Sequence, residues 1–339
     1  MIYSTSGPIF GAIDAMGRQT VTKVGSVKAD FRSIGENFLV SPDGSAIRFG
    51  YKYGGERPAY FSIRERTLVR TSGFASGFDS PIFPPPNGRL IMYGLDIKNW
   101  FNRENPKLGD KSLRLKRNET SRSLAIAPDG RRFLLGTEWY LRLFDARGRQ
   151  IWRVVAPGAA WGVNITRNGK LALAAFGDGT IRWYRMEDGE ELLGFFPHKN
   201  GKEWVVWTPD GYYMSSPNGD NFIGWHINNG KNQAAVFYKA VQFERILYRP
   251  DYVRAYFRHS GNTGKARNLV GSAFFDIRKL ASIAPPRIDF LSPNHATTVT
   301  NSIIKLKISV DRRSLPMRDF TVFVNSIPVT PFRERDLSG

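Results

Sequence analysis

The sequence contains no cysteine among its 339 residues. This absence excludes disulfides, thiolate metal sites and cysteine nucleophiles. It is consistent with a reducing cytoplasm, where we expect the protein to reside. The sequence also has no apolar run long enough to cross a bilayer. Residues 1–18 lack the basic start and apolar core of a signal peptide.

Histidine is scarce, and its four positions, His198, His226, His259 and His295, do not share the spacing of a metal-ligand pair. No Gly-x-Ser-x-Gly nucleophile motif is present. The stretch His259–Lys265 lacks the glycine spacing of a phosphate-binding loop. We therefore expect a non-enzymatic protein with no catalytic residue, no metal and no cofactor.

Positive charge, by contrast, is abundant. The chain carries 49 Lys and Arg residues against 30 Asp and Glu residues, a net charge of +19. Such an excess is typical of a surface tuned for solubility or for an acidic partner domain, or of a protein that binds a polyanion such as nucleic acid or an anionic membrane surface. The basic residues are spread along the chain without a nucleic-acid recognition motif. We therefore expect them on loops and strand edges rather than in one deep groove.

One kind of turn recurs at a nearly constant interval. Short apolar runs precede the turns Ser41–Gly44, Pro86–Gly88, Ala127–Gly130, Arg167–Gly169 and Pro209–Gly211, and the final glycines are 39 to 44 residues apart. A period near forty with turn residues at fixed places is typical of the four-stranded blades of a β-propeller. A helical repeat would instead place apolar residues at i, i+3 and i+4. The acidic residues of these turns are explained by turn geometry, not by acid–base chemistry.

The repeats predict an all-β, WD-repeat-type β-propeller with five full blades and one partial blade. The partial blade is Ile2–Val24, where the chain enters partway through a blade. The second repeat carries a polar insertion, Asn99–Lys111, which we expect to be a surface loop. The fifth blade runs from Glu203 to Gly230, and Ala234–Phe243 is expected to add its fourth strand.

The pattern changes after residue 247, so we divide the chain into a propeller (1–247), a short helical linker (248–284) and a partial immunoglobulin-like β-sandwich (285–339). The linker is expected to hold a helix over Tyr252–Arg258 and another over Ala266–Ile283. Strands are expected at Ile288–Leu291, Ile303–Val310 and Phe320–Val324. A complete sandwich needs about seven strands, so we expect the chain to be a piece of a longer protein.

The region from about 160 to 295 resembles one known bacterial family. The matching segments are Trp204, Trp207–Tyr213, Ser216–Pro217, Ile223–His226 and Tyr248–Asp251, with Pro285–Ile288 further along. They are similar to the WD-repeat β-propeller region of bacterial caspase-like (C14-type) peptidase proteins, together with the start of the immunoglobulin-like segment that follows it. The peptidase domain, with its His-Cys dyad, has no counterpart here, so no catalytic residue is carried over.

The resemblance implies a regulatory part of a caspase-like system, which acts as a protein-interaction scaffold or sensor. Its expected partners are proteins, among them a caspase-like peptidase domain. The alternative is a basic propeller that binds nucleic acid. The candidate partner-binding residues are Trp204, Trp207, Tyr212, Tyr213, Trp225 and His226, for which core packing is the alternative role.

Overall fold

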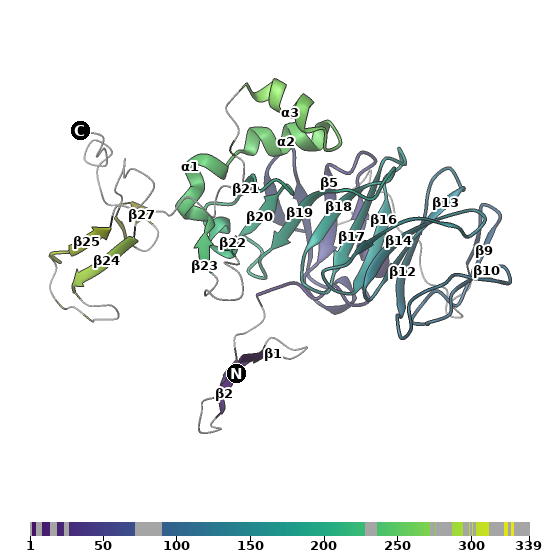
Figure 1. Cartoon of the computed structure of the whole chain (residues 1–339), viewed down its shortest axis with the longest axis horizontal. Helices are drawn as coiled ribbons and strands as arrows, with labels where there is room; N and C mark the ends of the chain where they lie inside the picture. The colour runs from purple at the N-terminus through teal and green to yellow at the C-terminus, as the bar shows by residue number, and fades with distance from the viewer. Residues whose placement is uncertain are drawn as a thin grey trace. The chain divides into compact units, whose positions relative to one another are not determined.

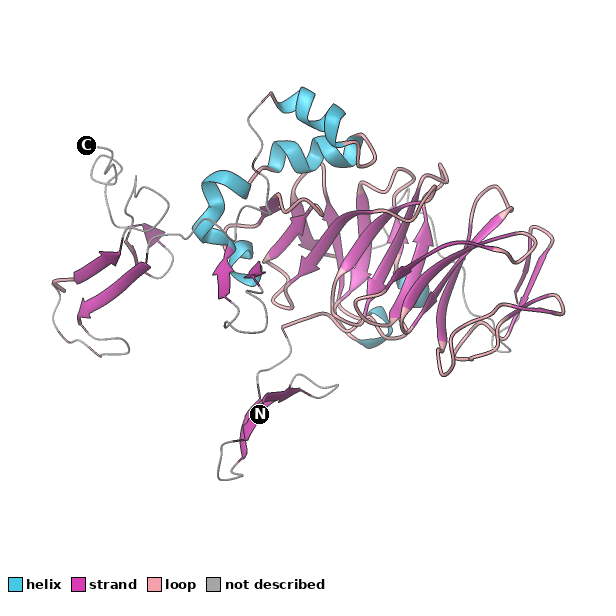
Figure 2. Cartoon of the chain, viewed as in Figure 1, coloured by secondary structure: helices cyan, strands magenta, loops and turns pink. Residues whose placement is uncertain are grey.

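The computed structural model describes residues 2–4, 9–13, 19–23, 27–71, 90–227, 236–271, 287–293 and 303–311, together with 275, 298, 300, 322–324 and 327–328. Within these residues the chain consists mainly of antiparallel β-sheets with few helices (Figures 1 and 2). No sheet closes into a barrel in the described part of the chain. Contacts divide the chain into two compact units, residues 1–224 with 247–273, and residues 225–246 with 274–339.

Four sheets of the first unit begin with four consecutive antiparallel strands, as the repeats predict. The first sheet holds β4 (Leu39–Val40), β5 (Ala46–Gly50), β6 (Pro58–Ser62) and β7 (Thr67–Arg70). The second holds β8 (Leu90–Met92), β9 (Leu95–Lys98), β10 (Lys107–Leu108) and β11 (Lys111–Ser112). The third holds β12 (Ser121–Ile126), β13 (Arg132–Thr137), β14 (Tyr140–Asp145) and β15 (Gln150–Val155). The fourth begins with β16 (Ala160–Ile165), β17 (Leu171–Phe176), β18 (Ile181–Arg185) and β19 (Glu191–Pro197).

The recurring turns have one geometry. Gly44, Gly130, Gly169 and Gly211 each have a positive φ, between 64° and 88°, which suits glycine because it has no Cβ. Each donates its backbone N–H to the carbonyl of the residue three positions earlier. The predicted turns therefore form at these four positions. The fifth predicted turn, Pro86–Gly88, lies outside the described residues.

The fifth predicted blade does not form as a separate sheet. Strands β20 (Trp204–Trp207) and β21 (Tyr213–Ser215) continue the fourth sheet, which thus has six strands in the order β16 to β21. The expected four-stranded meander over Glu203–Phe243 is therefore wrong. The pairing also explains why β19 is largely buried while β15, the outer strand of the third sheet, is largely exposed. The loop between β19 and β20 is short enough for a hairpin, and local pairing takes precedence over a new blade.

The polar insertion in the second repeat also departs from the expected surface loop. Strand β10 lies within it and pairs with β9, and the side chain of Trp100 is 1% exposed. This tryptophan joins an apolar cluster with Leu95 and Ile97 of β9 and with Phe133 of β13. The insertion therefore contributes to the core between two sheets.

The four sheets that hold β4 to β21 pack face to face in a row that differs from their order in sequence (Figure 1). One apolar cluster joins the sheet β8–β11 to β12–β15, and a second joins β12–β15 to β16–β21. On the far face of β16–β21 lies the sheet β4–β7, where Phe61 stacks on Phe195 at 4.1 Å between ring centroids. Because β5, β13 and β17 are buried almost throughout, their sheets need a partner on both faces.

Two helices belong to the first unit. Helix α2 (Pro250–Arg258) begins at the proline expected near its start, and α3 (Thr263–Val270) begins three residues earlier than the predicted helix. Asn262 caps α3 by accepting a hydrogen bond from the backbone N–H of Lys265. The end of the predicted second helix lies outside the described residues. Helices α2 and α3 pack against each other, and α2 contacts β19 and β21 (Figure 1).

The remaining elements are short. At the N-terminus β1 (Ile2–Ser4), β2 (Ile9–Ile13) and β3 (Gln19–Lys23) form a three-stranded sheet. In the second unit β22 (Gly224–Ile227) pairs with β23 (Val236–Lys239), followed by α1 (Glu244–Leu247). Strand β24 (Arg287–Ser292) pairs with β25 (Lys307–Asp311), and β26 (Phe323–Val324) with β27 (Ile327–Pro328). These pairs fall on or beside the strands expected after residue 285.

Candidate functional site

Four of the six candidate partner-binding residues lie in the first unit, and three of them are buried. The exposed fractions of Trp204, Tyr212 and Tyr213 are 4%, 1% and 0%. Trp204 packs on Phe61, with 4.9 Å between ring centroids. Trp207 is half-buried, and the Arg182 guanidinium carbon lies 5.9 Å from its ring centroid. Tyr212 packs edge-on against Tyr252 of α2, and Tyr213 against Tyr248. The three buried side chains therefore take part in packing, which is the alternative role.

The other two candidates lie on β22 of the second unit. Trp225 is half-buried and meets Phe243 edge-to-face, with 5.6 Å between ring centroids. His226 follows it on the strand, but its side chain lies outside the described set. The structure therefore does not gather the six residues into one site.

A different site is formed in the first unit by segments far apart in sequence. A cavity of about 570 Å³ lies among the turns of the sheets β4–β7 and β16–β21 and the helix α2. Its lining residues are Asp43, Ile63, Arg64, Asn168, Lys170, Leu171, Arg254, Phe257, Arg258 and Ser260. We call this cavity the basic cavity, because its lining includes four cationic side chains and one carboxylate.

The recurring turns place two of the charged residues at the rim of the basic cavity. Asp43 lies in the β4–β5 turn, where its carboxylate accepts hydrogen bonds from the backbone N–H and the hydroxyl of Ser45 and from the hydroxyl of Ser41. It also pairs with Arg64 of the β6–β7 turn. Burial raises the pKa of Asp43, but these hydrogen bonds and the Arg64 charge outweigh it, and its pKa is lowered. Lys170 follows the same kind of turn, between β16 and β17.

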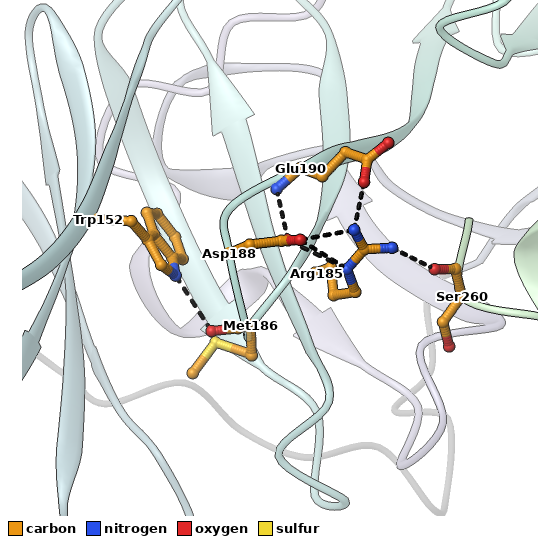
Figure 3. A network of polar contacts seen from close by, with 6 residues as sticks. All are labelled: Trp152, Arg185, Met186, Asp188, Glu190 and Ser260. Atoms are coloured by element: carbon orange, nitrogen blue, oxygen red, sulfur yellow. Dashed lines mark hydrogen bonds and ion pairs between the residues drawn. The ribbon is translucent and has the colours of Figure 1, made fainter. Parts of the chain in front are cut away.

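Helix α2 forms the third wall and is held at both ends. Near its start, the Tyr252 hydroxyl donates to the Asp210 carboxylate at 2.6 Å. Just after its end, the carbonyl of Ser260 accepts a hydrogen bond of 2.9 Å from Nη1 of Arg185, the last residue of β18 (Figure 3). These two hydrogen bonds attach both ends of α2 to the sheet β16–β21, which positions Arg254 and Arg258 beside the cavity.

Figure 3 shows how the β18–β19 turn is itself kept in place. The Arg185 guanidinium also pairs with Asp188 and Glu190, and the hydrogen bond with Asp188 is the largest reason that the pKa of Arg185 is raised. From the neighbouring sheet, the indole N–H of Trp152 donates to the carbonyl of Met186 at 3.0 Å. The anchor of α2 is thus part of a network that spans two sheets.

The four cationic side chains of the basic cavity differ in whether they form an ion pair with a carboxylate. Arg64 pairs with Asp43, as described above. For Lys170, Arg254 and Arg258, no carboxylate among the described residues forms an ion pair. All three side chains are exposed to solvent. The lining therefore carries positive charge that no described acid neutralises.

Several arginines in or beside other turns, in contrast, are paired. Arg132, Arg149 and Arg185 each form an ion pair with an acid three to five residues away in sequence, and Arg249 does so with Asp251. Surface pairs of this kind are common in turns and each contributes about 0–1 kcal/mol to stability.

Other features of the described residues offer weaker candidates. No group of three His, Asp or Glu side chains in this part of the chain could hold a metal ion. No helix that the structure describes is long and apolar enough to cross a membrane. Two further cavities lie among the described residues of the first unit. One of about 110 Å³ lies beside Trp100 and Arg122, where Arg122 is already paired with Glu138. The other, of about 930 Å³, has two carboxylates on its lining, Asp30 and Glu56, and Asp30 is paired with Arg32.

Sequence reasoning missed the basic cavity because its residues come from three segments, around 43–64, 168–171 and 254–260. The one signal in the sequence is the spacing of Arg254 and Arg258, which places both on one face of the predicted helix. The expectation that the basic excess lies on loops and strand edges rather than in one deep groove stays a prediction, although four basic residues line this cavity. The sequence matches no protein-family model, and comparison with curated proteins gives no significant match.

Proposed function

We propose that the chain is a non-enzymatic interaction module that binds an acidic segment of a protein partner in the basic cavity. The observation that carries this proposal is the set of three cations, Lys170, Arg254 and Arg258, that line one cavity without a described carboxylate partner. Complementary charge steers association and selects partners. The apolar residues Ile63, Leu171 and Phe257 on the same lining favour a peptide that carries apolar as well as acidic side chains.

The finer fold assignment belongs to the same proposal. The four-stranded meanders, the repeated glycine turns and the face-to-face packing support blades of a WD-repeat-type β-propeller. The antiparallel pair β24–β25 supports the first strands of an immunoglobulin-like segment. The resemblance to caspase-like (C14-type) peptidase proteins makes a peptidase domain of that class the expected partner. The absence of cysteine is the reason to propose regulation rather than peptidase activity.

The second candidate function is nucleic-acid binding, and the net charge of +19 is the observation that favours it. The two functions differ in their response to salt. Duplex DNA releases about 0.9 counterion per phosphate contact, so log K falls steeply and linearly with log salt. A short acidic peptide that makes few charged contacts gives a much shallower slope.

The test is fluorescence anisotropy with three labelled probes: a peptide of alternating Glu and Leu, the same peptide with Gln in place of Glu, and a DNA duplex. We expect the Glu peptide to bind and the Gln peptide not to bind. Lys170→Glu and Arg254→Glu should each abolish most of this binding, whereas Lys202→Glu makes the same charge change at an exposed residue outside the cavity lining. Equal losses in all three variants, or steep salt-dependent binding of DNA alone, would contradict the proposal.

A further inference from the structure

The arrangement of cations in the basic cavity is more specific than a diffuse positive surface. Arg254 and Arg258 are four residues apart on α2, so they share one face of the helix, and Lys170 lines the same cavity from the β16–β17 turn. Two guanidinium groups and one ammonium group thus border one space. A guanidinium group can donate bidentate hydrogen bonds to two oxygens of one phosphate, and an ammonium group contributes a further positive charge.

This arrangement carries a cost that an ordinary surface would avoid. Like charges four residues apart on a helix repel each other and destabilise the helix. The position of Arg258 in the last turn of α2 accounts for one cation, because the helix dipole favours positive charge there. It does not account for Lys170, which lies in a turn of a different sheet. A ligand with more than one negative charge would compensate all three.

The cavity also limits the shape of such a ligand. Asp43, the one carboxylate of the lining, is already held by Ser41, Ser45 and Arg64, so it leaves the three other cations unpaired. The side chain of Ile63 is 1% exposed and that of Leu171 is 4% exposed, and Phe257 is half-buried. Phe257 therefore supplies most of the apolar surface beside the cations, because Ile63 and Leu171 are almost fully covered. The lining therefore suits a ligand in which a compact anionic group is attached to an apolar segment.

We propose that the basic cavity recognises a phosphorylated side chain in a peptide segment of the partner. This inference rests on the proposed function, because it names the chemistry of the acidic group that the module binds. A phosphorylated Ser, Thr or Tyr carries a charge of about −1.5 to −2 at pH 7 and three acceptor oxygens, whereas a Glu carries one charge. Recognition of phosphorylated motifs by clustered arginines is an established mode of peptide binding.

The experiment compares arrayed peptides of identical sequence that carry Ser, Thr or Tyr, their phosphorylated forms, or Glu at one central position, bound to the purified chain. We expect the phosphorylated forms to bind at least tenfold more tightly than both the unmodified and the Glu forms. Affinity should fall as pH decreases through about 6, the second pKa of a phosphomonoester. The affinity of the Glu peptide should not change over that range.

Variants then assign the effect to the basic cavity. Lys170→Gln, Arg254→Gln and Arg258→Gln should each weaken phosphopeptide binding about tenfold, since one charge-assisted hydrogen bond contributes about 1.5 kcal/mol or more. Lys202→Gln, with the same charge change outside the lining, should leave affinity unchanged. Circular dichroism and urea unfolding of each variant check that the fold is retained.

Four outcomes would overturn the inference. Equal affinity for Glu and phosphorylated peptides would contradict the phosphate while leaving the acidic-partner proposal intact. Binding of free phosphoserine or inorganic phosphate as tight as the phosphopeptide would contradict a peptide ligand. Equal loss in the cavity variants and in Lys202→Gln would contradict the site. If neither Glu nor phosphorylated peptides bind, both the inference and the proposed function fail.

Discussion

The ion pair between Glu119 and Arg142 offers the sharpest test of how the third sheet is stabilised. Arg142 lies on β14, and the exposed fractions of the two side chains are 2% for Arg142 and 0% for Glu119. Nε and Nη2 of Arg142 both donate to Glu119, at 3.0 and 2.5 Å. Glu119 also accepts hydrogen bonds from the Thr137 hydroxyl and from the backbone N–H of Lys116. The carboxylate is thus fully satisfied inside the fold.

The perturbation is Glu119→Gln, which keeps the shape of the side chain and removes its charge. Arg142 then remains buried with its positive charge uncompensated, although Nη1 still donates to Gln150. Breaking a buried pair by removing one partner costs about 3–5 kcal/mol of the free energy of unfolding. For a unit of this size, 1 kcal/mol shifts the melting temperature by about 2–4 °C. We therefore expect a decrease of roughly 6–20 °C.

The assay is urea unfolding followed by circular dichroism, in which the midpoint falls while the m value stays constant. The matched control is Glu138→Gln, which removes the partner of Arg122 in a pair whose side chains are 20% and 30% exposed. We expect that variant to lose about 1 kcal/mol or less. A double variant, Glu119→Leu with Arg142→Met, should recover much of the loss, because a well-packed apolar pair avoids the desolvation of two charges.

The pH dependence gives an independent check. Burial raises the pKa of Glu119, but the hydrogen bonds from Arg142, Thr137 and Lys116 and the Arg142 charge outweigh it, so the pKa lies below the ordinary 4.5. The pair therefore contributes fully above about pH 4.5 and loses its contribution as pH falls through the lowered pKa. The difference between the wild type and Glu119→Gln should shrink over that range. A loss below 1 kcal/mol at pH 7, or a difference that grows with acidity, would refute the reasoning.

Two further changes test the six-stranded sheet and the attachment of α2. Gly194→Ala should lower the free energy of unfolding by about 1–3 kcal/mol, because a Cβ there would lie 2.3 Å from the ring of Trp207; an unchanged urea midpoint would mean that β20 does not pair with β19 as described. Tyr252→Phe removes the hydrogen bond to the Asp210 carboxylate and should cost about 1.5–3 kcal/mol, measured by thermal unfolding. Hydrogen exchange in α2 should rise in that variant, and unchanged exchange would show that the bond does not hold the helix.

The local structure of the chain could be predicted from the sequence because it depends on neighbouring residues. The turn at Gly130 needs a residue that accepts a positive φ, and the alternation and β-rich composition of its flanking runs specify strands. Pro250 likewise predicts the first turn of α2, since its missing N–H has no partner at a helix start. Such features are determined within a few residues.

The packing between sheets, in contrast, could not be predicted from the sequence. Trp204, Tyr212 and Tyr213 have the composition of a binding surface, yet the structure buries them, because the fold decides which face of a strand another sheet covers. The sequence equally allowed β20 and β21 to begin a new sheet or to extend the old one. Backbone hydrogen bonds to β19 decide between the two, and these depend on how the strands meet in space.

The sequence by itself determined an all-β chain with repeated turns, two short helices after residue 247 and a large positive charge without cysteine. Only the tertiary structure placed Lys170 on the same cavity as Arg254 and Arg258 and left them without a described acid partner. The physical reason is range: a turn is specified by the dihedral preferences of adjacent residues, whereas a binding cavity depends on contacts between segments more than eighty residues apart.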